Sequence, residues 1–102
     1  MTYIEELQEA IRHRYHVEPI YVETVPVHEQ FQGQTVWEGE VEVFDIPEFT
    51  DANRVYAWAY ETDQVDEPKR TVTVLHVPPV TSPELAVRAA IIKDYREQQE
   101  NH

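Results

Sequence analysis

The sequence has no cysteine, two glycines and one serine, and each shortage removes a class of function. Without cysteine, the chain cannot form disulfides, thiolate zinc sites or a cysteine nucleophile. Gly33 and Gly39 are too few for a glycine-rich loop that cradles phosphate. The single serine, Ser82, precedes Pro83 and Glu84, an order typical of a helix start. Enzyme chemistry therefore has little support, although carboxylates are plentiful enough for an acid/base pair.

Positive charge is also scarce, since eight Lys and Arg residues stand against 20 Asp and Glu, for a net charge of -12. Nucleic acids and anionic membranes are bound through Lys and Arg, so we expect neither as a partner. A basic protein partner suits this charge better. The sequence contains no apolar run of about 18 residues that would cross a membrane. Its N-terminus lacks the apolar core of a signal peptide, so we expect a cytoplasmic protein.

Without cysteine, histidine is the main candidate zinc ligand, and the spacing of the histidines gives little indication of a site. His13 and His16 are three residues apart on a predicted helix, while His28 and His76 lie at the ends of predicted strands. A zinc site needs three or four converging ligands. We therefore expect no metal and no other cofactor.

The apolar periodicity predicts a single domain over residues 1–102 with the order α-β-β-β-β-α. Thr2 and Glu5 form a capping box at the start of a helix over 3–16, and a second helix is predicted over 83–98. The predicted strands cover 20–28, 35–46, 54–61 and 70–77. Pro26 indicates that the first strand lies at a sheet edge. Short connections favour an antiparallel meander of three or four strands, a two-layer α+β fold with both helices on one face.

Each of the two glycines predicts a local backbone feature. Gly33 is expected to take a positive φ in the turn between the first two strands. Gly39, inside the second strand, indicates a bulge or the close approach of a neighbour.

The strands at 35–46 and 54–61 alternate strictly and suggest an interaction surface. If Val55, Ala57 and Ala59 face the helices, the opposite sheet face carries two sets of side chains. These candidate residues are Glu38, Glu40 and Glu42 on one strand and Tyr56, Trp58 and Tyr60 on the other. The alternation itself is also compatible with the opposite orientation, in which the aromatic side chains fill the core.

These patterns predict a non-catalytic protein-interaction or self-association module that uses an open sheet face. Its partner would be a second copy of the chain or a basic protein, because carboxylates beside aromatic rings suit Arg and Lys. One alternative is a small-ligand-binding protein or enzyme with a pocket between helices and sheet, lined by Trp37 and Tyr95. A further alternative is an acidic mimic of nucleic acid.

Overall fold

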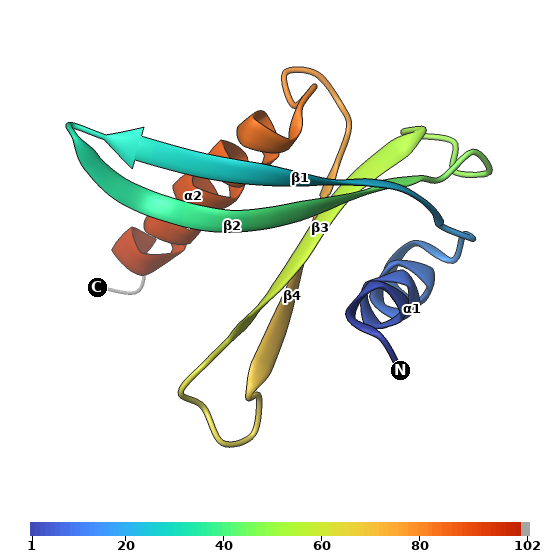
Figure 1. Cartoon of the computed structure of the whole chain (residues 1–102), viewed down its shortest axis with the longest axis horizontal. Helices are drawn as coiled ribbons and strands as arrows, with labels where there is room; N and C mark the ends of the chain where they lie inside the picture. Colours follow the sequence, from blue (N-terminus) through green and yellow to red (C-terminus); the bar gives the residue numbers. More distant parts are fainter. Residues whose placement is uncertain (101–102) are drawn as a thin grey trace.

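A computed structural model of the chain describes residues 1–100, and the side chains of residues 1–99 (Figure 1). Four antiparallel strands form one sheet in the order β1-β2-β3-β4, and a helix lies at each end of the described chain. The elements are α1 (Tyr3–Tyr15), β1 (Ile20–Phe31), β2 (Gln34–Asp45), β3 (Arg54–Glu61), β4 (Lys69–Leu75) and α2 (Pro83–Glu100). The predicted α+β class, element order and meander are confirmed.

Local signals place several of these boundaries. The Thr2 hydroxyl accepts from the Glu5 N–H and the Glu5 carboxylate accepts from the Thr2 N–H, both at 3.2 Å, so the capping box is present. The helix ends at Tyr15, because His16 takes a left-handed conformation with φ of 57°. Its backbone N–H donates to the Arg12 carbonyl at 2.8 Å.

The two glycines behave differently from each other. Gly33 has φ of 79° and forms, with Gln32 at 53°, a two-residue hairpin turn, as predicted. Gly39 pairs with Val27 in regular register, so there is no bulge at this position. The reason for glycine is the neighbouring Trp37 ring, which would lie 3.1 Å from a Cβ at position 39. Of the two predictions for Gly39, close approach is correct and the bulge is wrong.

The two helices pack on opposite faces of the sheet, so the predicted arrangement with both helices on one face is wrong (Figure 1). On the α1 face, Leu7 and Ile11 pack against the sheet. Their partners are Phe44, Ile46, Val55 and Ala57. On the α2 face, Ala86 and Val87 pack against the opposite set, namely Val27, Val41, Val43, Tyr56 and Trp58. The fold therefore has three layers, helix, sheet and helix.

The strand register explains this correction. Val43 lies directly opposite Tyr56, so the two side chains share a face. The apolar stripe of β2 and the aromatic stripe of β3 therefore form one surface, which α2 covers. The small side chains of β3, including Ala57, face α1.

The sheet splits along its middle. β1 pairs with β2 over eleven residue pairs and β3 with β4 over seven, whereas β2 pairs with β3 over only four. Beyond this short seam the two hairpins diverge, and Figure 1 shows them running in clearly different directions. Beyond the four pairs, the facing edges of β2 and β3 are therefore not paired with each other.

Candidate functional site

The six candidate surface residues do not share one face of the sheet, so the prediction that they form one exposed surface is wrong. Glu42 lies on the α1 face, together with Glu38 and Glu40 by strand alternation. The three aromatic residues of β3 lie on the α2 face. Tyr56 and Trp58 are 2% and 4% exposed and belong to the core, and only Tyr60 is substantially exposed, at 40%. The opposite orientation of β3 is the correct one.

The split between β2 and β3 nevertheless brings four of the six residues around one hollow. The hollow is lined by Glu38, Glu40, Trp58 and Tyr60, with Tyr3, Trp37, Gly39 and Ala59. Aromatic contacts close its floor, since the Trp37 and Trp58 rings meet edge to face with centroids 5.6 Å apart. The backbone N–H of Ala59 has no strand partner and donates to the Tyr3 hydroxyl at 2.9 Å. Core residues of the sheet and Tyr3 of α1 therefore both line the split.

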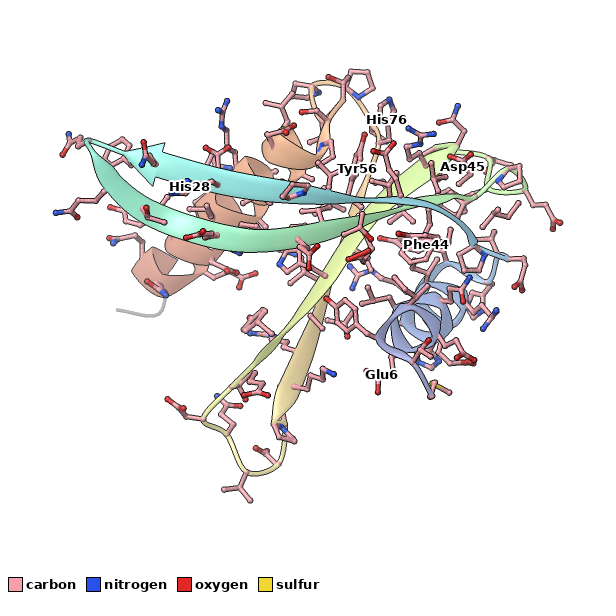
Figure 2. All side chains as sticks on the ribbon, in the orientation of Figure 1. Glu6, His28, Phe44, Asp45, Tyr56 and His76 are labelled. Carbon is pink, nitrogen blue, oxygen red and sulfur yellow. The ribbon has the colours of Figure 1, made fainter. Side chains whose placement is uncertain are left out.

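Buried polar groups in the described part of the chain are satisfied. Glu42 is 3% exposed, and its carboxylate accepts a short hydrogen bond from the Thr24 hydroxyl. The Tyr56 hydroxyl lies 2.6 Å from His76 Nδ1 (Figure 2). Burial raises the pKa of the Tyr56 phenol above its usual value. No described buried side-chain polar atom lacks a hydrogen-bond partner, so none is directed unpaired into a cavity.

The alternative pocket between helix and sheet contains one of its two predicted lining residues. Trp37 lines a hollow beneath α2, but Tyr95 does not contribute to it and is 62% exposed. The lining is apolar except for Tyr60 and Asp94. Among the described residues, no group of three or more His, Asp or Glu side chains is placed to hold a metal ion.

The outer edge of β4 is a site that the sequence reasoning missed. Hydrogen bonds beyond both ends of the β3–β4 ladder show which amides face each other. The His76 N–H donates to the Arg54 carbonyl and the Thr62 N–H to the Pro68 carbonyl, both at 2.9 Å. Because alternate amides point to opposite sides of a strand, the even-numbered residues of β4 pair with β3.

The odd-numbered residues of β4, which include Thr71, Thr73 and Leu75, therefore direct their backbone groups away from the sheet. The Leu75 carbonyl accepts from the Val77 N–H at 2.9 Å. The amide groups of Thr71 and Thr73 and the N–H of Leu75 have no partner among the described residues. Together they form a regular row of donors and acceptors spaced for a further strand.

The opposite outer edge, on β1, lacks this regularity. By the same alternation, Val25 and Val27 direct their amides to β2, and Pro26 lies with its nitrogen outward. Proline has no N–H to donate, and it is tolerated at this outward position. The register of β1 also shifts twice, between Tyr21 and Glu23 and between Glu29 and Gln30, whereas the β3–β4 register has no shift. The predicted edge position of the first strand is confirmed, and this edge is poorly suited to pairing.

The β4 edge forms the floor of a groove between the two helices, here named the β4 groove. Arg14 and Tyr15 of α1 line one wall, and Ala89, Lys93 and Asp94 of α2 contribute to the other. The Tyr15 hydroxyl lies 3.0 Å from the Thr73 hydroxyl and fixes the end of α1 beside the strand. The groove therefore presents an unpaired strand edge with a helix on each side.

The sequence did contain a signal for this edge. The run Arg70–Val77 has no proline, alternates Thr with Val, and is the last strand of a predicted meander. A terminal strand of a meander is an edge strand, and the absence of proline leaves its donors intact.

Comparisons with known proteins do not extend these observations. Among the described helices, none combines the length and the apolar character that a membrane span requires. No family model matches the chain, and neither a curated protein nor a solved structure is similar to it.

Proposed function

We propose that the chain is a cytoplasmic, non-catalytic protein-interaction module that binds an extended segment of another polypeptide as a fifth strand in the β4 groove. The observation that carries this proposal is the unpaired row of backbone groups at Thr71, Thr73 and Leu75. Strand addition of this kind obtains affinity from main-chain hydrogen bonds and specificity from alternate side-chain positions.

Each element around the groove supports this function. The edge is held rigid by a regular seven-pair ladder to β3. Tyr15 is anchored to Thr73, so the end of α1 is fixed above the α1 side of the edge. On the other side, Ala89 and Ala90 of α2 line the groove with small side chains, which leave room for those of an added strand. Around β3 and β4 both faces of the sheet are covered by helices, so the edge of β4 is the accessible part of this region.

The test uses one substitution that removes only the outward donor. Thr73→Pro eliminates the outward N–H of Thr73 while the ladder to β3, formed by even-numbered residues, stays intact. Thr73→Val is the matched control, because it removes the same hydroxyl contact to Tyr15 but keeps the N–H. A library of displayed random peptides is selected on the immobilised wild-type chain, with circular dichroism to confirm that both variants fold.

Strand addition predicts enriched peptides with alternating apolar positions, whose binding survives Thr73→Val and falls at least about tenfold with Thr73→Pro, as expected for loss of about 1.4 kcal/mol. An absence of enriched peptides, or equal binding to the two folded variants, would show that the edge is not a binding site.

A further inference from the structure

The charge around the β4 groove differs from that of the rest of the chain. Acidic residues outnumber basic ones by 20 to 8 overall, yet the groove is lined by three cations and two carboxylates. The cations are Arg14, Arg70 and Lys93, and the carboxylates are Asp94 and Glu97. The groove lining therefore carries one more cation than carboxylate, whereas the whole chain has a net charge of -12.

Two of these three cations form no ion pair in the described part of the chain, as is also true of Arg96, which lies outside the groove lining. Five of the eight basic side chains form ion pairs with described carboxylates, and neither Arg14 nor Lys93 is among them. Arg70 is paired with Glu67, but at 3.8 Å, the longest of the ion-pair distances in the described chain. Ion pairs elsewhere are shorter, such as Arg88 with Glu29 at 2.7 Å. The lining of the β4 groove thus contains two cations, Arg14 and Lys93, that could meet an anionic ligand without first leaving an ion pair.

The side chains along β4 define the other half of the specificity. Val72 and Val74 lie on the α2 face, opposite Trp58 and Tyr56, and project beside the small Ala89. Thr71 and Thr73 lie on the α1 face. A strand added at this edge would place alternate residues beside the valines, so these residues should be apolar. Its remaining side chains would lie beside the threonines and near Arg14.

We infer that the occupant of the β4 groove is an acidic, extended segment of a different protein, with apolar residues at alternate positions and carboxylates between and beyond them. This inference rests on the proposed function and names the chemistry of the partner. At physiological ionic strength charges are screened beyond about 8 Å, so a ligand in the groove meets mainly the three cations and two carboxylates of the lining, and distant carboxylates contribute little. Main-chain pairing supplies the affinity, and the cations select the sign of the charge.

A second copy of the chain is less well matched to the groove. Pairing of two β4 edges about Thr73 would bring the two α1 ends together, because Tyr15 contacts Thr73 in each copy. Arg14 would then approach the Arg14 of the other copy, and like charges at a shared site repel. Each copy would also carry its net charge of -12 into the complex.

The experiment compares two fluorescein-labelled peptides of about ten residues, the length that spans an edge strand. In one, valine alternates with glutamate and further glutamates follow at both ends. In the other, lysine replaces every glutamate. Binding to the wild-type chain is measured by fluorescence anisotropy and repeated with Thr73→Pro, Thr73→Val and the double variant Arg14→Glu, Lys93→Glu. Sedimentation equilibrium of the chain alone reports self-association.

We expect the glutamate peptide to bind the wild type at least about fivefold more tightly than the lysine peptide, as a difference of about 1 kcal/mol implies. Thr73→Pro should abolish this binding, Thr73→Val should preserve it, and the double variant should reverse the preference. Tighter binding of the lysine peptide would overturn the acidic chemistry and leave strand addition standing. Dimerisation lost with Thr73→Pro would identify the occupant as a second copy and likewise overturn the inference. Insensitivity of both peptide binding and self-association to Thr73→Pro would overturn the proposed function itself.

Discussion

Trp58 tests the central correction to the sheet, because its place in the core follows from the register between β2 and β3. The side chain is 4% exposed and contacts Trp37 edge to face. A buried aromatic side chain removes about 150–250 Å² from water, which corresponds to about 4–6 kcal/mol at about 25 cal/mol per Å². Truncation to alanine retains part of this burial, so Trp58→Ala should cost about 3–5 kcal/mol.

This loss is large relative to the whole stability of a chain of 102 residues, which is expected to be about 5–15 kcal/mol. Urea unfolding followed by circular dichroism measures it. With a denaturant slope of about 1.5 kcal/mol per M, the midpoint should fall by about 2 M or more. Tyr60→Ala is the matched control, because Tyr60 is the next residue on the same face of β3 and is 40% exposed. Its midpoint should change by less than the equivalent of about 1 kcal/mol. Equal midpoints for Trp58→Ala and the wild type would refute the assignment of this face to the core.

Two further substitutions test contacts that fasten the helices to the sheet. Arg88→Ala should lower the free energy of unfolding in urea by about 1.5–3 kcal/mol. The substitution leaves the largely buried Glu29 carboxylate without the guanidinium that donates to it at 2.7 Å. A loss below about 0.5 kcal/mol would mean that water replaces this contact fully. Tyr3→Phe should cost about 0.5–1.5 kcal/mol at pH 7, because the Ala59 N–H loses its acceptor. Burial raises the pKa of the Tyr3 phenol above 10.0, so its contribution is complete below pH 10 and is lost as the pH rises through the raised value. The stability gap between the wild type and Tyr3→Phe should therefore narrow above pH 10, and a gap that widens there would contradict the direction of this pKa shift.

Much of the fold was predictable because the local signals agree with the final structure. The capping box at Thr2 and the positive φ at Gly33 each depend on a few neighbouring residues. Pro26 identified an edge strand because a missing donor is tolerated only where no neighbour pairs. Such signals depend on chemistry within one element and are independent of its partners.

The helix arrangement was not predictable from the same kind of signal. Both faces of β3 are apolar, with valine and alanines on one and tyrosines and tryptophan on the other. Either face could be buried, and in the structure both are. Which face of β3 lies beside the valines of β2 depends on which β2 residue lies opposite Tyr56. This pairing is set by the loop between β2 and β3 and by their four residue pairs.

The candidate site illustrates the same limit. Glu38 and Trp58 reach a common hollow only because the sheet splits, a feature that no single strand encodes. Predicting the outward backbone groups at Thr71 and Thr73 requires knowing whether the odd- or the even-numbered residues of β4 form hydrogen bonds to β3. The sequence does not reveal this.

The irregular border at Pro26 also determines how many molecules can join. Of the two outer edges of the described sheet, β4 has an intact row of donors and β1 does not. A molecule with one regular outer border can pair edge to edge through its outer borders with at most one other copy of itself. A sheet that grows indefinitely by pairing of strands needs two usable edges on each molecule. The proline on β1 thus leaves β4 as the outer border with an intact row of donors, so pairing of copies through their outer borders would stop at a dimer.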